Sequence, residues 1–328
     1  MSLRIIKPGI LDTVQDTGRY GYQHLGINPN GAMDRYSAQL SNALLGKDLN
    51  AAVIELHFPA SQILFEKETL FCICGADFLP TINELPIPMG HPVVASGDSI
   101  LRFQNLLRGS RCYISLLNDM KLDRWMKSYS TNLKISAGGW MGRALAKNDQ
   151  LHCMDTIEVG SLLKGKQFSF LPWKANETVE YKNEIEFIIG SEWYWLTREA
   201  QQIFRTSFFQ ISNHADRMGY RLMGPELMCK DEEQLVSSAV SFGTVQLLPS
   251  GQLIILMADH QTTGGYPRIA HVISAHLPIL AQKKANDVIQ FQLTDLKSAE
   301  EKMIRQQKYL REIQIACKFR LENLLNAS

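Results

Sequence analysis

The chain has 328 residues, of which 45% are hydrophobic and 20% are charged, and its formal net charge at pH 7 is +1. This composition is typical of a soluble globular protein with two domains or one large β-rich unit. The near-neutral charge and the lack of long basic or apolar runs exclude a strong electrostatic site for nucleic acid and a membrane-spanning helix. The first residues lack the hydrophobic region of a signal peptide, so we expect a cytoplasmic protein.

Short runs rich in β-branched and aromatic residues recur along the chain, bounded by Gly, Pro, Asn or Asp. This pattern predicts a mainly β protein whose strands are joined by turns. The runs that we interpret as strands are residues 53–58, 62–65, 70–74, 99–103, 111–117, 185–189, 243–248, 253–258 and 288–293.

Helical signals are fewer. One helix is predicted to begin near Asp34 and to end at Gly46, and a second short helix is predicted over residues 268–275. From residue 295 to 326, apolar residues recur every seven positions among charged and polar ones, which predicts a long amphipathic C-terminal helix. Two roles stay open for this helix: packing on its own chain, or forming a surface for a partner or a second copy.

The order of the motifs repeats along the chain, which is the sign of an internal duplication. The stretch from Asp16 to Gly26 resembles the stretch from Asp216 to Gly224, and similar strands follow each of them. We interpret the repeat as a duplication of one β-barrel-like unit. The predicted domains are residues 1–117, residues 118–294 and the C-terminal helix at residues 295–328.

The cysteines and the common motifs argue against a metal site or a nucleotide fold encoded by this chain alone. Of six scattered cysteines, only Cys72 and Cys74 are close, and on a strand both would point to one face. Core packing in a reducing compartment is the expected role. The sequence has no phosphate loop, dinucleotide motif, nucleophile elbow or His-Glu-x-x-His motif.

Two clusters combine aspartate and arginine side chains. The first contains Asp16, Arg19 and Asp34, where Asp34 could equally be the N-cap of the predicted helix. The second contains Asp216 between two nearby arginines, Arg217 and Arg221. An arginine can hold a carboxylate or phosphate with two parallel hydrogen bonds, but Asp216 and an arginine could also form a structural ion pair.

The third cluster, residues 257–268, is the densest in functional groups. It follows a buried-strand run and combines charged, amide and hydroxyl side chains. Gly264 and Gly265 would let the backbone approach a ligand closely, and their N–H groups could form an anion-binding nest. If the duplication is real, the second and third clusters belong to one barrel and can converge at its mouth.

Written out, these clusters resemble the signature of a known family. The matching motifs are Val14-Gln15-Asp16-x-Gly18-Arg19, Gly31-Ala32-Met33-Asp34, Asp216-Arg217-Met218-Gly219-Tyr220 and Met257-Ala258-Asp259-x-Gln261-Thr262-Thr263-Gly264-Gly265-Tyr266-Pro267. The family contains the C subunits of 5-oxoprolinase, the KipA proteins and the second part of the urea carboxylase carboxyltransferase region. The resemblance runs from residue 4 to 292 and implies two cyclophilin-like β-barrel units.

The resemblance also implies an activity and partners. The leading function is the C subunit of an ATP-dependent 5-oxoprolinase, which opens 5-oxo-L-proline to L-glutamate together with a KipI-like protein (its B subunit) and a protein of the type of its A subunit. ATP and Mg²⁺ would bind at a site shared with a partner. The implied site has the catalytic residues Asp216, Arg217, Asp259, Gln261 and Thr262 and the substrate-binding residues Arg19, Asp34, Arg221, Thr263, Gly264, Gly265 and Tyr266.

The resemblance implies a different role for each group of residues in that site. Arg217 or Arg221 would hold the substrate carboxylate. Asp216 or Asp259 would act as a base or a magnesium ligand. The hydroxyl groups of Thr262 and Thr263 and the N–H groups of the two glycines would line the oxygen that gains negative charge, and Tyr266 would shape the pocket.

The sequence departs from the family pattern where a loop would shape a pocket. Asn118-Asp119 stands where relatives carry Gly-Gly, and residues 127–131 (Lys-Ser-Tyr-Ser-Thr) replace Gly-Ser-x-Ser-Thr. Two other functions therefore stay open. One is a carboxyltransferase subunit of a biotin-dependent urea or amide carboxylase, with biotin on a separate carrier because the chain has no Met-Lys-Met. The other is a KipA-like regulator that antagonises a KipI-type histidine kinase inhibitor.

Overall fold

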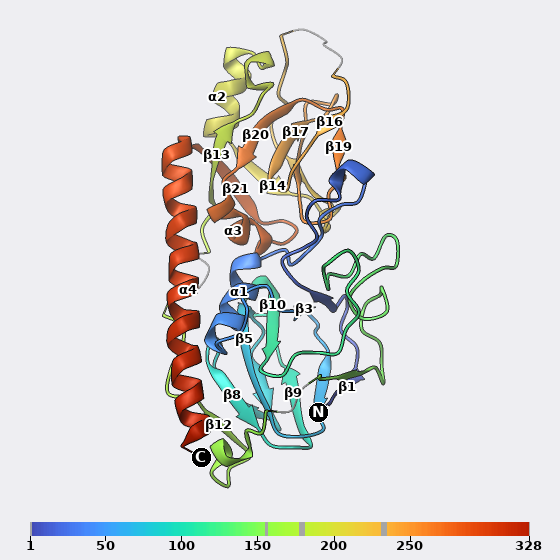
Figure 1. Ribbon diagram of the computed structural model, residues 1–328. Coiled ribbons are helices and arrows are strands. Elements are labelled where there is room, and N and C mark those ends of the chain that lie inside the picture. The colour runs from blue at the N-terminus through green and yellow to red at the C-terminus, as the bar shows by residue number, and fades with distance from the viewer. Residues whose placement is uncertain (1, 155–156, 177–180, 231–234, 328) are drawn as a thin grey trace. The chain divides into compact units, whose positions relative to one another are not determined.

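The chain divides into two compact units, each discontinuous in sequence (Figure 1). The computed structural model describes residues 2–154, 157–176, 181–230 and 235–327. The first unit is Met1–Gly18, Asp34–Val179 and Gln307–Ser328, and the second is Arg19–Met33 and Glu180–Gln306. The predicted boundary at residues 117 and 118 therefore falls inside the first unit. The reason is that later strands, at Gln150–His152 and Phe168–Phe170, pair with strands of that unit.

The first unit contains two antiparallel sheets that enclose one hydrophobic core. Phe65 of one sheet packs on Phe71 of the other, with ring centroids 4.9 Å apart, as expected for face-to-face sheets. One sheet is built from β1 (Ser2–Lys7), β4 (Gln62–Phe65), β6 (Pro80–Ile82), β7 (Leu85–Pro86), β9 (Ser99–Phe103) and β11 (Gln150–His152). The other is built from β2 (Thr13–Gln15), β3 (Val53–His57), β5 (Thr69–Asp77), β8 (Pro92–Ala95), β10 (Arg108–Leu116) and β12 (Phe168–Phe170).

Strand order places the longest strands in the middle of the second sheet. The two orders are β11-β1-β4-β9-β6-β7 and β12-β8-β5-β10-β3-β2. Along β5, Phe71 and Ile73 enter the core, so Cys72 and Cys74 lie together on the opposite face and are also buried. Burial raises the pKa of the Cys72 thiol well above its usual value, with a further contribution from Cys74. Cys72 and Cys74 form no disulfide and serve as core residues, as the sequence predicted.

Helix α1 (Arg35–Leu44) packs against β5 and β10 and has the predicted ends. Asp34 is its N-cap: one carboxylate oxygen accepts from the Ser37 backbone N–H at 2.8 Å and the other from the Ser37 hydroxyl at 2.6 Å. Gly46, just beyond the helix, has a φ of 66°. A Cβ at Gly46 would lie 2.5 Å from the Cα of Lys318, so only glycine allows this close approach of the C-terminal helix.

The second unit is built on a closed seven-stranded barrel. Its strands are β13 (Glu184–Ile189), β14 (Phe208–Ile211), β15 (Gly219–Met223), β17 (Thr244–Leu247), β18 (Leu253–Leu256), β20 (Arg268–Val272) and β21 (Val288–Leu293). Their order is β13-β20-β17-β18-β15-β14-β21, and a parallel pairing of β13 with β21 closes the barrel. A separate two-stranded sheet pairs β16 (Ser238–Ala239) with β19 (Thr263–Gly264).

The predicted helix over residues 268–275 is wrong. Residues Arg268–Val272 form β20, which pairs with β13 on one side and β17 on the other. The run of apolar residues suits a strand with both neighbours in place, which periodicity alone does not distinguish from a buried helix. The helix comes later, as α3 (Leu277–Ala281), with Pro278 in its first turn.

Aromatic side chains fill the barrel interior, where helix α2 (Arg198–Thr206) contributes Phe204. This ring stacks on Phe291 of β21 at 4.4 Å and meets Phe187 of β13 edge-on at 5.0 Å. Thr197 caps α2 by accepting from the Ala200 backbone N–H. Each aromatic ring buries a large apolar area, so this cluster is a main source of the stability of the second unit.

The predicted C-terminal helix is present as α4 (Leu296–Asn326). In the second unit, Lys302 forms an ion pair with Glu186, and the Gln306 amide donates to the Ala275 carbonyl at 3.1 Å. In the first unit, the Gln314 amide donates to the Lys47 carbonyl at 2.6 Å. Packing on its own chain, one of the two roles left open for this helix, is therefore observed.

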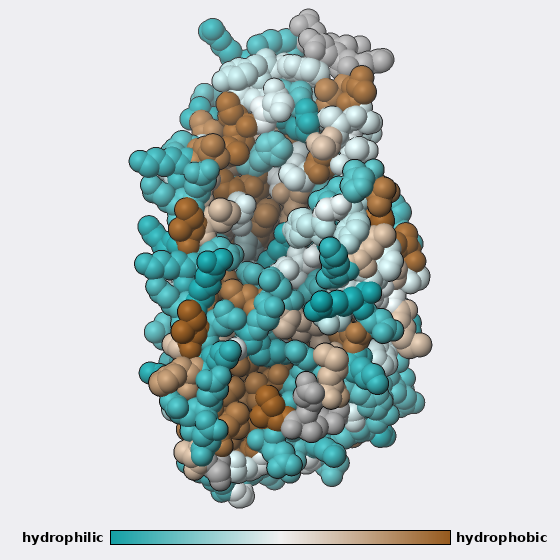
Figure 2. Space-filling view, in the orientation of Figure 1, coloured by the Kyte–Doolittle hydropathy of each residue, from teal (hydrophilic) through white to brown (hydrophobic). Residues whose placement is uncertain are grey.

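The buried stripe of α4 is shorter than the heptad pattern predicted. Leu310, Cys317 and Leu321 are buried, whereas Leu296 and Met303 remain exposed. Most of the outward surface of α4 is hydrophilic, with separate apolar side chains (Figure 2). In the described parts of the chain, no helix combines the length and the hydrophobicity needed to cross a bilayer.

The predicted fold class is confirmed in its main terms. The chain is mainly β, with few helices, a closed barrel and a long C-terminal helix. Each strand run predicted from the sequence overlaps a strand of the structure. The first unit differs from the expected closed barrel, because its strands hydrogen-bond within two separate sheets.

Candidate functional site

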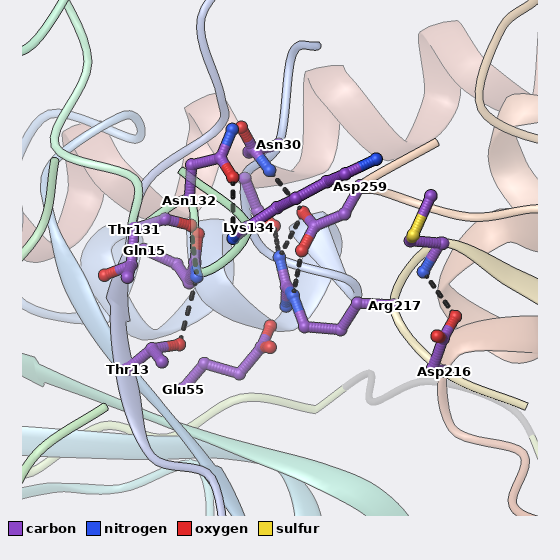
Figure 3. Close-up of polar contacts among 12 residues, drawn as sticks. Thr13, Gln15, Asn30, Glu55, Thr131, Asn132, Lys134, Asp216, Arg217 and Asp259 are labelled. Atoms are coloured by element: carbon purple, nitrogen blue, oxygen red, sulfur yellow. Dashed lines mark hydrogen bonds and ion pairs between the residues drawn. The ribbon is translucent and has the colours of Figure 1, made fainter. Parts of the chain in front are cut away.

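A buried ion pair between Arg217 and Asp259 is the centre of a polar cluster in the second unit (Figure 3). Arg217 precedes β15 and Asp259 follows β18, and the antiparallel pairing of these strands brings the two residues together. The guanidinium binds the carboxylate with two hydrogen bonds, Nε to Oδ2 at 2.9 Å and Nη2 to Oδ1 at 3.0 Å. The predicted convergence of the second and third clusters is confirmed for this pair.

Residues of the segment Arg19–Met33 complete the cluster. The Asn30 amide donates to Oδ1 of Asp259 at 2.7 Å, and the Asn28 amide donates to the Asp259 carbonyl at 3.0 Å. Arg217 Nη2 donates to the Gly31 carbonyl at 2.7 Å, and Arg19 donates to the Asn30 side-chain oxygen. Arg19 and Asn30 are almost fully buried. Two guanidinium groups and one carboxylate therefore share one hydrogen-bonded network.

This geometry corrects the roles first given to Arg217 and Asp259. The Arg217 fork is bound to Asp259, so it cannot also grip a substrate carboxylate with both arms. Asp259 accepts two hydrogen bonds on Oδ1 and one on Oδ2. These contacts hold Asp259, at the start of the third cluster, against Arg217 and Asn30. Asn30 was missed from the sequence; its signal is the Asn-Gly pair at residues 30–31, where Asn30 has a φ of 55°.

Asp216 and Arg221 lie apart from this pair (Figure 3 shows Asp216). The Asp216 carboxylate accepts from the backbone N–H groups of Met218 at 2.7 Å and Gly219 at 3.0 Å, which forms the turn into β15. Arg221 is exposed, on the opposite face of β15 from the buried Tyr220. Asp216 is thus held by backbone donors, while the guanidinium of Arg217 forms its ion pair with Asp259.

The glycines of the third cluster do not form the expected anion-binding nest. Thr263 and Gly264 belong to β19, and neither Gly264 nor Gly265 has a positive φ, which a nest requires. A Cβ at Gly264 would lie 2.6 Å from the amide nitrogen of the buried Gln246. Gly264 thus allows close packing on Gln246, which donates to the Tyr266 carbonyl at 3.4 Å.

The end of the third cluster borders a cavity of about 890 Å³ in the second unit. Gly265, Tyr266 and Pro267 line it together with residues 226–230 and 247–251 and Trp195. Tyr266 lines the cavity and is exposed enough to contact a ligand there. Gln261, Thr262 and Thr263 do not line it; Thr262 is half-buried, and the other two are exposed. The volume lies within the range of small-molecule sites, roughly 300–1,000 Å³.

A second ion pair follows the third cluster. Arg268 Nη2 lies 2.7 Å from Oε1 of Glu192, and the Arg268 backbone N–H also donates to this carboxylate. His271, on the same strand, lies 3.2 Å from the Thr244 hydroxyl through Nδ1. Burial lowers the pKa of His271, and the charge of Arg268 lowers it further against the opposing effect of Glu192.

The shifted pKa of His271 predicts a pH-dependent stability. Because its pKa is lower in the folded than in the unfolded chain, the unfolded chain takes up a proton more readily as the pH falls through about 6.5. The stability that neutral His271 contributes is therefore complete above that pH and is lost toward pH 5. In urea unfolding at pH 7.5, 6.5 and 5.5, His271→Gln is expected to lose less stability on acidification than the unchanged chain. Equal losses would contradict this assignment.

In the first unit, Asp16 ties two loops together. Its Oδ1 accepts from the Gly18 backbone N–H at 2.8 Å and from the hydroxyls of Ser128, at 2.7 Å, and Ser130. Its Oδ2 accepts from the Tyr129 backbone N–H at 2.6 Å. The first cluster is thus divided, because Asp16 belongs to the first unit and Arg19 to the second.

The structure places Asp34 at the N-terminus of α1. It is fully buried, and both of its carboxylate oxygens cap α1. Its backbone N–H donates to the Tyr113 hydroxyl at 2.8 Å, which in turn donates to Glu55 at 2.8 Å. The N-cap role that the sequence left open for Asp34 is confirmed.

A smaller cavity, of about 270 Å³, lies beside Asp16 in the first unit. The segments that depart from the family pattern both reach it, through Asp119 and through Lys127 and Tyr129. The expectation that these segments shape a pocket is confirmed. Its polar lining residues are Asp16, Thr17, Asp48, Asn50, Asp119, Arg124, Lys127 and Tyr129.

Among the described residues, no group of three or more His, Cys, Asp or Glu side chains is placed to hold a metal ion. The carboxylates described above are instead engaged by arginine, amide, hydroxyl and backbone donors.

Comparison with known proteins places these motifs in one family. Residues 25–293 match the model of the carboxyltransferase domain, subdomain A and B. The chain is 33% identical to the 5-oxoprolinase C subunit of Escherichia coli over 95% of this chain and 97% of that protein. It is 32% identical to the 5-oxoprolinase C subunit of Haemophilus influenzae over 92% and 94% of the two chains. It is 27% identical to urea amidolyase of Saccharomyces cerevisiae, over 88% of this chain but 16% of that protein.

Solved structures agree with this placement. The Kluyveromyces lactis urea carboxylase matches with a TM-score of 0.86 and 25% identity, over 95% of this chain and 29% of that chain. The Kluyveromyces lactis urea amidolyase shares the fold with a TM-score of 0.87, over 95% of this chain and 20% of that chain. The chain therefore belongs to the carboxyltransferase domain, subdomain A and B, family.

Proposed function

We propose that the chain is the C subunit of an ATP-dependent 5-oxoprolinase, which converts 5-oxo-L-proline to L-glutamate together with a KipI-like protein (its B subunit) and a protein of the type of its A subunit. One observation carries the proposal. The chain matches proteins named as C subunits of 5-oxoprolinase along nearly its whole length and theirs. The match covers 92–95% of this chain and 94–97% of those proteins. Its match to the urea amidolyases covers only 16–17% of their length.

The reaction requires activation of an unreactive amide. 5-Oxoproline is a five-membered lactam, and amide resonance makes its hydrolysis slow; ATP would supply the activation of the carbonyl oxygen. In this proposal ATP and Mg²⁺ bind at a site that this chain shares with a partner protein. This chain would contribute ligand-binding surface and hydrogen-bond donors for an oxygen that gains negative charge.

Within the second unit, the proposed donors are the hydroxyls of Thr262 and Thr263. The Arg217–Asp259 pair fixes the loop that leads to them, because Asp259 is held by the guanidinium and by Asn30. Tyr266 would contact a ligand in the larger cavity that it lines. In this proposal Arg217 and Asp259 are positioning residues and not catalytic ones.

A carboxyltransferase function is the second candidate. The close fold match to the Kluyveromyces lactis urea carboxylase favours it. In that case the chain would help to move a carboxyl group from biotin on a separate carrier to urea or another amide. The two candidates differ in substrate and in the need for a biotin carrier, so one assay can separate them.

A substrate panel tests the proposal. The chain is mixed with its KipI-like partner, the third protein of the enzyme and Mg·ATP, and supplied in parallel with 5-oxo-L-proline or with urea, bicarbonate and a biotinylated carrier protein. We expect ATP-dependent glutamate from 5-oxo-L-proline and no carboxylation of urea. Glutamate no higher than in a control without ATP would reject the proposal, and carboxylated urea would support the second candidate.

A further inference from the structure

The smaller cavity in the first unit contains two cations without acidic partners. In the described part of the chain, neither Arg124 nor Lys127 forms an ion pair, although both line the cavity. The Arg124 guanidinium lies over the Tyr129 ring, with Cζ 4.8 Å from the ring centroid. A guanidinium that stacks on an aromatic ring can still donate hydrogen bonds in its own plane.

The carboxylates of the same cavity already have partners. Asp16 accepts four hydrogen bonds from its two neighbouring loops. Asp119 lies 2.7 Å from Lys47 Nζ, and Asp48 accepts from the Asn50 backbone N–H at 2.9 Å. The unused charged groups of the cavity are therefore cationic, which favours an anion as the ligand.

Lys127 is held in a backbone conformation that costs energy. Its φ is 63°, in the left-handed region that glycine adopts freely and lysine does not. Trp125 and Ser128 exchange two backbone hydrogen bonds that close a two-residue turn, in which Met126 and Lys127 both have a positive φ. The Asp16 carboxylate binds the next residues, Ser128 and Tyr129. A strained residue with a charged side chain at the wall of a cavity is a reason to look for a ligand there.

Size and charge narrow the class of anion. A volume of about 270 Å³ is too small for a nucleotide and suits a molecule of about ten non-hydrogen atoms. Asp48 and Asp119 on the same lining would repel a multiply charged phosphate but could accept hydrogen bonds from an N–H or ammonium group. A small amino acid or its lactam has the required size, and it combines one carboxylate with an ammonium or N–H group.

We propose that this cavity binds a small amino-acid-like carboxylate, with its carboxylate between Arg124 and Lys127 and its nitrogen donor toward Asp48 and Asp119. The identity of the ligand rests on the function proposed above, where it is 5-oxo-L-proline or its product L-glutamate.

The test uses the full-length chain, titrated by calorimetry with sodium 5-oxo-L-proline, L-glutamate and, in a separate arm, sodium phosphate. The variants are Arg124→Gln and Lys127→Gly. Lys164→Gly is the matched control, because Lys164 is an exposed lysine with a positive φ of 49° away from the cavity lining. Both glycine variants relieve the same kind of strain, so they should have equal or higher thermal unfolding midpoints.

We expect at least one of the two carboxylates to bind with a measurable Kd. That Kd should rise by about tenfold or more in Arg124→Gln and Lys127→Gly, as the loss of a charge-assisted hydrogen bond implies, and should not change in Lys164→Gly. Three results would overturn the proposal: no saturable binding of either carboxylate, a Kd within about twofold of the original in both cavity variants, or phosphate binding as tight as that of the carboxylates.

The outcomes for this site and for the proposed function are separable. If the three-protein mixture forms glutamate but the KM for 5-oxo-L-proline is unchanged in both cavity variants, the function stands and this site is wrong. If the mixture forms no glutamate but the chain binds L-glutamate in a manner that both variants weaken, the site stands and the function is wrong.

Discussion

Replacing Arg217 with Ala is expected to lower the free energy of unfolding by about 3–5 kcal/mol, the usual cost of leaving a buried carboxylate without its ion partner. The guanidinium is 6% exposed and the Asp259 side chain 14% exposed, so water cannot replace the lost contacts easily. Arg217 also donates to the Gly31 carbonyl, which would lose this partner. Urea unfolding followed by tryptophan fluorescence measures the effect.

Two further variants control this prediction. Arg221→Ala removes an exposed arginine from the same strand and should change the free energy of unfolding by less than about 0.5 kcal/mol. Arg217→Lys keeps the charge but not the two-pronged hydrogen bonds, so it should recover only part of the loss. A loss below about 1 kcal/mol in Arg217→Ala would mean that the pair is not the centre of the cluster.

Replacing Asp16 with Ala is expected to have the second-largest effect, a loss of roughly 3 kcal/mol together with the loss of ligand binding in the smaller cavity. The carboxylate accepts hydrogen bonds from Gly18, Ser128, Tyr129 and Ser130. Hydrogen bonds to a charged group contribute about 1.5–3 kcal/mol each, and they are not additive when they share one acceptor. Hydrogen exchange should show faster exchange of the Gly18 and Tyr129 amides.

Asp48→Ala is the control for the Asp16 variant. Asp48 lines the same cavity but is exposed and accepts from the Asn50 backbone N–H in a local turn. Its replacement should leave the exchange rates of Gly18 and Tyr129 unchanged. Equal acceleration in both variants would show that the two loops do not depend on Asp16.

Local signals predicted much of the fold. The N-cap at Asp34 and the glycine at residue 46 bound α1 as expected, because capping depends on residues close in sequence. The strand β20 was mistaken for a helix because its pairing partners, β13 and β17, are distant in sequence, so the local sequence does not reveal them. The division into units was also missed, since it depends on late strands that return to the first unit.

The sequence predicted only the part of the candidate site that lies at the ends of two paired strands. Arg217 and Asp259 flank paired strands, so their approach follows from sequence order. Asn30 joins them across more than 180 positions of sequence, and no local pattern predicts such a contact. Arg124 and Lys127 sit in an irregular loop whose conformation depends on the distant Asp16, so the cavity that they line became visible only in the structure.

The proposed function makes this chain a required component of a 5-oxoprolinase. The most direct measurement is the rate of glutamate formation from 5-oxo-L-proline and ATP while this chain is titrated into fixed amounts of its KipI-like partner and the third protein of the enzyme. If the proposed function is right, no glutamate forms without the chain, and the rate rises until the three proteins reach a fixed ratio. The same rate with the chain omitted, or no glutamate at any ratio, would contradict it.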